Sequence, residues 1–215
     1  MSPDWSAERR EMVERQLRRR GLRDQRVLDA MLAIPREEFV PLESRVSACQ
    51  DAPISIGYGQ TISQPYMTAL MAQELQLTGA ETVLEIGAGS GYAAAVLGAL
   101  ALRVIAIEIV PALAEIARDN LRRTGLGRNI EIIAGDGSLG HVALSPYDAI
   151  SVAAAAPEIP PALLEQLKDP GRLVIPVGER DDQELCVILK RAGRIDYRVS
   201  TFCRFVPLVG PGGWR

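Results

Sequence analysis

The sequence predicts an α/β fold: a doubly wound, mostly parallel sheet with antiparallel C-terminal strands and an N-terminal helical extension. From residue 82 onward, short apolar runs alternate with helical patterns. This rhythm is typical of a parallel sheet covered by helices on both faces. Near the C-terminus, "ELCVILKR" and "DYRVSTFCRFVPL" follow each other with no helical pattern between them, which indicates antiparallel strands.

The N-terminal extension is expected to hold two helices. Ser6 can cap a first helix that runs to about Arg20, with Gly21 as its stop signal. Pro35 closes a second, shorter helix. The segment 41–64 has no periodicity, although it carries the polar motif "YGQTISQP". The apolar face of the second helix is expected to consist of Val27, Leu28, Met31 and Leu32.

The core begins with a helix whose first position suits Pro65. The apolar positions of this helix, expected to lie in the core, are Met67, Leu70, Met71 and Leu75. The remaining elements are then expected in the order "TVLEI", "YAAAVLGAL", "RVIAIEI", "PALAEIARDNLRR", "IEIIAGD", "YDAISVAAA", "PALLEQL" and "RLVIPVG".

Composition excludes several classes of protein. The 215-residue chain has a formal net charge of −3, so it lacks the basic excess of most nucleic-acid-binding proteins. Arginines at 9–23 are interleaved with glutamates, which favours a solvated amphipathic helix. The N-terminus has no apolar signal region, and no apolar run approaches the roughly 20 residues of a membrane span. Three cysteines without a C-x-x-C pair, Cys49, Cys186 and Cys203, favour buried, reduced thiols and a cytoplasmic protein.

A glycine loop connects the first core strand to the next helix in "VLEIGAGSGYAAAVL", and its glycines are Gly87, Gly89 and Gly91. Such a loop at the carboxyl end of a strand lets a ligand approach the backbone. Glu108 ends the next strand, 21 residues after Gly87, close to the ~20 expected for an acid that binds ribose hydroxyls. Asp136 and Gly137 follow the third strand. These features predict an adenosine ligand. The alternative is that the acids only cap the following helices.

The loop suits S-adenosylmethionine better than NAD. A dinucleotide fingerprint needs a glycine where this chain has Tyr92, so the loop lacks the third glycine for close helix packing. It also lacks a phosphate-binding lysine. Glu85, Glu108 and Asp136 would repel a pyrophosphate but suit hydroxyls, an ammonium and a sulfonium cation. A dehydrogenase is therefore a distant alternative.

The methyl acceptor is predicted to be a carboxylate. After the fourth strand, Ala153 to Ala156 offer no hydrogen-bonding side chain to an amine. The only histidine, His141, lies in a loop and is not expected to act as a base. A carboxylate needs no base because it is already ionised at pH 7, with an ordinary pKa near ~4. Its methylation requires alignment and exclusion of water.

Six segments in order resemble the bacterial protein-L-isoaspartate O-methyltransferase family: "IGYGQTISQPYM", "VLEIGAGSGY", "GDGSLG", "APEIP", "GRLVIPVG" and "RFVPL". Together with "VLDAMLAIPREEFVP", they extend the resemblance over almost the whole chain. The resemblance implies a Rossmann-like methyltransferase sheet and methylation of the free carboxylate of isoaspartyl residues in damaged proteins. The ester then closes to a succinimide, which reopens partly to aspartate.

The resemblance also implies roles for individual residues. Gln60, Thr61 and Ile62 would close over the methionine part of S-adenosylmethionine. Ser63 would be the active-site serine, whose hydroxyl and backbone N–H bind the isoaspartyl carboxylate. Val206 would offer backbone groups to the substrate peptide. The remaining cofactor-binding residues would be Glu85, Gly87, Gly89, Gly91, Glu108, Asp136 and Gly137.

We therefore expect a single methyltransferase domain, residues 1–215. Residues 1–64 form the extension and substrate loop, and 65–215 form the cofactor-binding core. Its partners would be isoaspartyl-containing peptides and unfolded protein segments, not nucleic acid or membranes, and we expect a monomer. Two positions where the family often has threonine, Ala153 and Val209, depart from the pattern. The alternatives are a peptide carboxyl methyltransferase of narrowed specificity and a non-catalytic S-adenosylmethionine-binding homologue.

Overall fold

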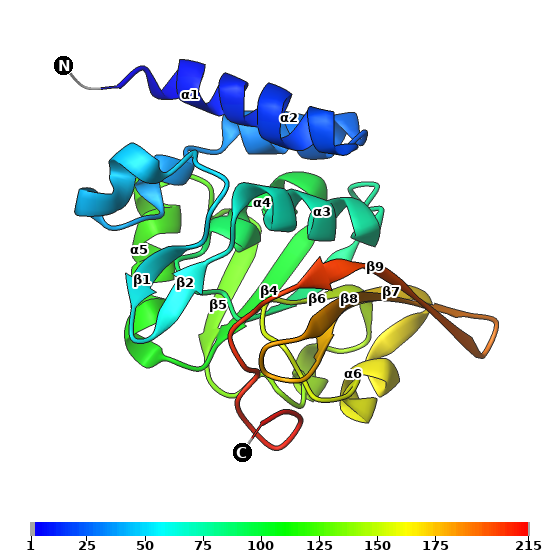
Figure 1. Ribbon diagram of the computed structural model, residues 1–215. Coiled ribbons are helices and arrows are strands. Elements are labelled where there is room, and N and C mark those ends of the chain that lie inside the picture. Colours follow the sequence, from blue (N-terminus) through cyan, green and yellow to red (C-terminus); the bar gives the residue numbers. More distant parts are fainter. Residues whose placement is uncertain (1–2, 215) are drawn as a thin grey trace.

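The computed structural model describes residues 3–214 and has a seven-stranded sheet at its centre (Figure 1). The strand order is β5-β4-β3-β6-β7-β8-β9. Neighbours from β5 through β7 pair in parallel, and β8 and β9 continue the sheet in antiparallel fashion. This confirms the predicted mixed sheet. The strands are β3 (Thr82–Ile86), β4 (Arg103–Glu108), β5 (Ile130–Ala134), β6 (Tyr147–Val152), β7 (Leu167–Gly178), β8 (Gln183–Arg191) and β9 (Arg194–Cys203).

The chain order places a topological switch between β3 and β6. From β3 the chain moves outward through β4 to β5, and then returns to the other side of β3 as β6. Ligands of doubly wound sheets bind at the carboxyl ends of the strands beside such a switch.

Helices cover both faces of the sheet because the strands are apolar on both sides. On one face, α3 (Pro65–Leu75), α4 (Tyr92–Leu100) and α5 (Pro111–Thr124) share a buried cluster with side chains such as Val83 and Val104. On the other face, α6 (Pro161–Glu165) contributes Leu163 to a second cluster with Leu84 and Ile105. Pro65 stands at the first position of α3, as predicted.

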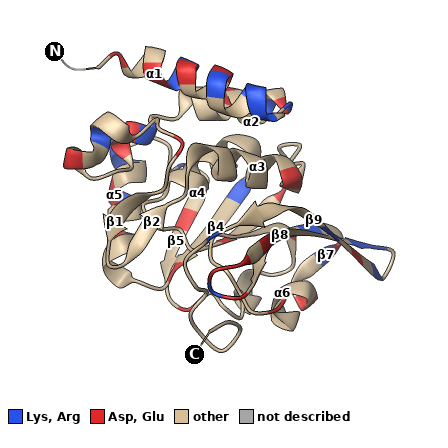
Figure 2. Ribbon diagram, in the orientation of Figure 1, with Lys and Arg blue, Asp and Glu red and all other residues tan. Residues whose placement is uncertain are grey.

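The N-terminal extension differs from the expectation at its start. Asp4, not Ser6, caps α1 (Trp5–Glu11), since the Asp4 carboxylate accepts a hydrogen bond from the backbone N–H of Ala7. The Ser6 hydroxyl instead accepts from Arg10. The helix widens to π-type hydrogen bonding at Met12–Leu17, tightens at Arg18–Arg20 and ends at Gly21 in the left-handed region. Its arginines and glutamates alternate along the surface, as expected (Figure 2).

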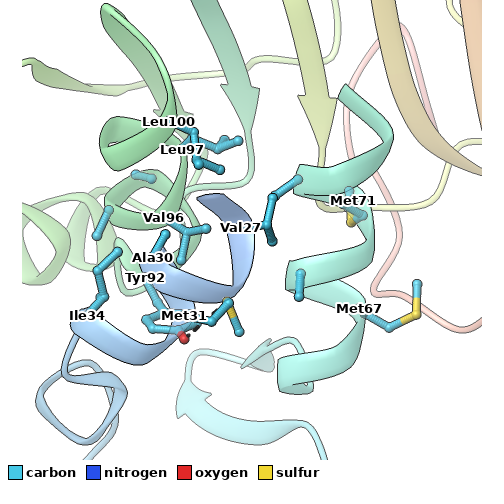
Figure 3. Packing of buried hydrophobic residues seen from close by; sticks show 14 of the residues in the cluster. Val27, Ala30, Met31, Ile34, Met67, Met71, Tyr92, Val96, Leu97 and Leu100 are labelled. Atoms are coloured by element: carbon cyan, nitrogen blue, oxygen red, sulfur yellow. Dashed lines mark hydrogen bonds between the residues drawn. The ribbon is translucent and has the colours of Figure 1, made fainter. Parts of the chain in front are cut away.

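The second helix, α2 (Gln25–Ala33), joins the extension to the core. Its apolar residues pack between Met67 and Met71 of α3 and the side chains of α4 (Figure 3). The predicted apolar face was wrong at Leu32, which is 37% exposed, whereas Ala30 and Ile34 are buried. Because α2 shares one hydrophobic cluster with the sheet, the extension is bound to the core by burial of apolar surface.

The segment 41–64 is more regular than its sequence suggested. It contains a 3₁₀ helix at Leu42–Ser47 and a hairpin formed by β1 (Ile54–Gly57) and β2 (Gln60–Ile62). Gly59 allows the tight turn with a φ of 72°. The hairpin brings the polar motif to the carboxyl edge of the sheet.

The cysteine prediction holds in part. All three thiols are unpaired; Cys49 and Cys186 are buried, whereas Cys203 is half-buried. Over residues 3–214, none of the helices combines the length and the apolar character that a membrane crossing requires.

Candidate functional site

A cavity of about 840 Å³, including its open mouth, lies at the carboxyl ends of β3, β4 and β6, where the strand order reverses. Its walls come from the β2 hairpin strand, the glycine loop, the end of β4 and the segment 206–209. Its position agrees with the predicted ligand site.

Two of the three loop glycines line the cavity. Gly87 and Gly89 have φ values of 91° and 55°, a region that side chains other than glycine rarely adopt. The N–H groups of Gly87 and Ala88 both donate to the carbonyl of Ile107, which fixes the loop against β4. The loop therefore presents bare backbone to a ligand.

Gly91 is packed against a helix, and its predicted role in cofactor binding stays a prediction. It does not line the cavity; a Cβ atom there would lie 3.3 Å from the Cα, Cβ and carbonyl oxygen of Ala117 in α5. Gly91 thus permits the close helix packing that the sequence argument denied to this loop. The next residue, Tyr92, is buried and does line the cavity.

Glu108 lies where the sequence predicted, at the end of β4 and in the cavity wall. It is 4% exposed. One carboxylate oxygen accepts from Gly89 N–H at 2.7 Å and the other from Val110 N–H at 2.9 Å. Each oxygen can accept a second hydrogen bond, so two acceptor positions remain for vicinal hydroxyls.

The two predicted residues in the loop after β5 lie in different places relative to the main cavity. Gly137 lines the cavity, but Asp136 is exposed and its carboxylate accepts from the N–H of Ser138. The C-terminal turn packs directly against it, because a Cβ at Gly210 would lie 2.6 Å from the Asp136 oxygens. A role for Asp136 in cofactor binding stays a prediction.

Glu85 lies behind the cavity and not in its wall. Only 1% of it is exposed, and neither carboxylate oxygen has a hydrogen-bond partner among residues 3–214. It lines a smaller cavity together with Ser63, Thr68 and Ser151. Burial, and next the charge of Glu108, raise the pKa of Glu85 to about 8, so the group is mostly neutral at pH 7. A neutral carboxylic acid can donate a hydrogen bond, and the hydroxyl-bearing residues of this otherwise mostly apolar cavity are the candidate partners.

Ser63 lies where three spaces meet. It borders the main cavity, the smaller cavity beside Glu85, and a groove of about 360 Å³ that opens outward past Val206. Gln60, Thr61 and Ile62 line the main cavity beside it. The fold therefore brings together the predicted site residues of the segment 60–63 and Val206, although these segments lie nearly 150 residues apart in the chain.

Sequence reasoning missed several residues of the site. Thr68 and Ser90 line the main cavity, and Arg36 holds Ser63 from behind, with its Nη2 donating to the Ser63 carbonyl at 2.7 Å. "PREEF" looks like a surface turn, so no sequence signal marks Arg36 as buried. The two departures, Ala153 and Val209, both lie in the cavity wall.

The ionisable side chains in the cavity wall are Glu108 and Tyr92. His141 does not border this cavity; its backbone N–H donates to Gln166 and its carbonyl accepts from Tyr147. No cluster of three or more potential metal ligands occurs in the part of the chain from 3 to 214. The site has a polar rim, a buried acid and no placed general base, so it can align reactants and exclude water.

The sequence of the chain is similar to one family of known proteins over almost its whole length. The family model described as protein-L-isoaspartate(D-aspartate) O-methyltransferase matches residues 7–212. A protein-L-isoaspartate O-methyltransferase of Methanoculleus marisnigri is 50% identical over 208 residues, covering 97% of this chain and 94% of its own. One of Koribacter versatilis is 50% identical over 216 residues, covering 99% and 97%.

Solved structures with a similar fold include members of the same family. A protein-L-isoaspartate O-methyltransferase has a TM-score of 0.83 at 30% identity, covering 96% of this chain and 67% of that one. A Plasmodium falciparum protein described as a beta-aspartate methyltransferase, in complex with S-adenosyl-L-homocysteine, has a TM-score of 0.81 at 28% identity. The match covers 97% of this chain and 99% of that one.

Proposed function

Because this chain belongs to the protein-L-isoaspartate(D-aspartate) O-methyltransferase family, we propose that it methylates the free carboxylate of isoaspartyl residues in damaged proteins, using S-adenosylmethionine. The observation that carries the proposal is the position of Ser63, which borders both the main cavity and the groove beside Val206. One space suits a small cofactor and the other suits an extended peptide.

The residues present fit S-adenosylmethionine. Glu108 has two unused acceptor positions for ribose hydroxyls, and Gly87 and Gly89 expose backbone beside them. The cavity wall contains no Lys, Arg or His that would repel a sulfonium or an ammonium. When bound, the cofactor supplies a methyl group on positively charged sulfur. Asp136 and Gly91 support this site, from the rim and through helix packing respectively.

The chain's own contribution to the reaction is alignment. Ser63 offers its hydroxyl and backbone N–H to the substrate carboxylate, and Val206 offers backbone groups to the peptide on the other side of the groove. The hairpin residues Gln60, Thr61 and Ile62 separate the two ligands from water. No proton has to be removed from a carboxylate at neutral pH, so the missing base is no obstacle.

The whole chain acts as one methyltransferase domain, in which residues 1–64 form the extension and substrate loop and residues 65–215 the cofactor-binding core, and both parts contribute to the cavity and to the groove. The ester product closes to a succinimide, and reopening returns part of the damage to aspartate. We expect a monomer that acts in the cytoplasm, where three unpaired cysteines stay reduced, without nucleic-acid or membrane partners.

The test is methyl transfer to paired peptides that differ only in an isoaspartyl or aspartyl linkage. The purified chain, with methyl-labelled S-adenosylmethionine, should label the isoaspartyl peptide alone, as a base-labile ester. Equal labelling of both peptides would overturn the specificity. Binding of S-adenosylmethionine without turnover of any isoaspartyl peptide would indicate a non-catalytic homologue, and turnover of one peptide sequence alone would indicate narrowed specificity.

Ser63→Ala should lower turnover of the isoaspartyl peptide while leaving the dissociation constant of S-adenosylhomocysteine near that of the wild type. Ser55→Ala is the matched control, because Ser55 is exposed on the other strand of the same hairpin. Full activity in Ser63→Ala would remove Ser63 from the site.

A further inference from the structure

The proposed substrate brings a negative charge into a site that has no cation in its cavity wall. Among the residues that line the main cavity, the charged side chain is Glu108, itself an acid. Arg204 borders the outer groove, but its side chain is 74% exposed and it pairs with Asp181. An exposed charge of this kind is strongly screened by water and salt. Besides the positively charged sulfur of the bound cofactor, any further positive charge near Ser63 has to come from behind the cavity wall.

Arg36 lies directly behind Ser63 and is fully buried. It belongs to the short 3₁₀ turn Arg36–Glu38 that follows α2. Its Nη2 donates to the carbonyl of Ser63 and its Nε to the carbonyl of Ala48, both at 2.7 Å. Its guanidinium carbon lies 4.7 Å from the ring centre of Tyr92, which lines the cofactor cavity.

No carboxylate among residues 3–214 pairs with Arg36. The two nearby acids are engaged elsewhere, since Glu37 pairs with Arg9 and Asp51 pairs with Arg20. The remaining guanidinium nitrogen, Nη1, is buried without a hydrogen-bond partner among the described residues. Burial lowers the pKa of Arg36, yet a guanidinium stays protonated in proteins. A buried cation without a counter-ion is costly unless an anion arrives to balance it.

We propose that Arg36 is a positioning residue for the isoaspartyl carboxylate. It fixes the backbone at Ser63, which borders the groove, and it supplies the buried positive charge that balances the bound substrate. Because it is shielded from solvent, this charge keeps its strength at physiological salt. The inference rests on the proposed function and adds to it a residue from the N-terminal extension.

The same chain offers a control in Arg26, which is exposed but shares the backbone-bracing contacts of Arg36. Its side chain also donates to two backbone carbonyls, that of Leu77 just after α3 at 2.5 Å and that of Leu100 at the end of α4 at 3.0 Å. Arg26 braces the helical layer but does not border the three cavities that meet at Ser63. Losing either arginine should lower the stability of the fold, whereas losing Arg36 alone should alter the peptide side of the site.

The experiment compares Arg36→Met, Arg36→Lys and Arg26→Met with the wild type. The readouts are the unfolding midpoint, the dissociation constant of S-adenosylhomocysteine, and kcat and KM for an isoaspartyl peptide. Arg36→Met should raise the peptide KM by about tenfold or more, the loss expected for a hydrogen-bonding charge, with the dissociation constant changed less than threefold. Arg36→Lys keeps the charge but loses the planar guanidinium, so its peptide KM should lie between those of the wild type and Arg36→Met. Arg26→Met should keep the wild-type KM.

A folded Arg36→Met with wild-type KM, or an equal rise of KM in Arg26→Met, would overturn the proposal. If both Arg36 variants fail to fold, the test is made on the wild type by NMR. The Arg36 Nε–H resonance should shift when an isoaspartyl peptide is added to enzyme saturated with S-adenosylhomocysteine. It should not shift when the aspartyl peptide is added. An unmoved resonance during peptide binding would refute the inference. Wild-type turnover tests the proposed function separately, so the two failures are distinguishable.

Discussion

The buried carboxyl group of Glu85 should make the stability of the fold depend on pH. Burial, with a smaller contribution from Glu108, raises the pKa of Glu85 from 4.5 to about 8. Glu85→Gln replaces the neutral acid by an amide of nearly the same shape that does not ionise. The variant should therefore lose the part of the pH dependence that Glu85 causes.

The sign follows from which state releases its proton first. Below pH ~4.5 Glu85 is protonated in both the folded and the unfolded chain and imposes no penalty. As pH rises, the unfolded chain ionises first, and each pH unit lowers the free energy of unfolding by about 1.36 kcal/mol until the folded pKa is reached. Between pH 5.5 and pH 8 the loss is about 3 kcal/mol.

The assay is urea unfolding followed by circular dichroism at pH 5.5 and pH 8, without cofactor. The free energy of unfolding of Glu85→Gln minus that of the wild type should grow by about 3 kcal/mol between the two pH values. Glu43→Gln, at an exposed carboxyl in the turn Leu42–Ser47, is the control and should show a flat difference. A difference for Glu85→Gln that is equally flat would show that Glu85 ionises normally in the folded chain.

Three further changes test other parts of the site. Glu108→Ala should weaken S-adenosylhomocysteine binding by ~1.5–3 kcal/mol, the usual range for hydrogen bonds to a charged group, and an unchanged dissociation constant by calorimetry would contradict the assignment. Gly91→Ala and Gly125→Ala both place a side chain at positive φ, which should lower the free energy of unfolding by about 1 kcal/mol. Only Gly91 is also tightly packed, so Gly91→Ala should lower the unfolding midpoint further, and equal midpoints would refute its packing role. His141→Ala should keep turnover within twofold of the wild type, and loss of activity in a folded variant would mean that a base acts after all.

The sequence predicted the strands and helices of the core because their apolar periodicity is local. "TVLEI" and "RVIAIE" form β3 and β4 as expected, and Pro65 begins α3. The cap of the first helix was wrong because Asp4 and Ser6 are both good cap residues, and the choice between them depends on where the chain approaches the core. The hairpin at 54–62 was missed because its strands are too short to show alternation.

The site was predictable where a residue's role follows from its place along a strand. Glu108, Gly87 and Gly89 belong to this class, since the end of a parallel strand reaches the ligand edge by topology. Glu85 could not be placed, because side chains alternate along a strand and a single position decides whether an acid faces the cavity or the layer behind it. Arg36 could not be found either, since its burial results from packing between distant segments.

The two halves of the catalytic centre are supported by different parts of the molecule. The cofactor side is built on the sheet, whereas the serine loop is tied through Arg36 and Ala48 to turns that lie outside it. Natural or laboratory selection acting on the first 50 residues should therefore retune which damaged sequences are accepted without disturbing methyl-donor affinity.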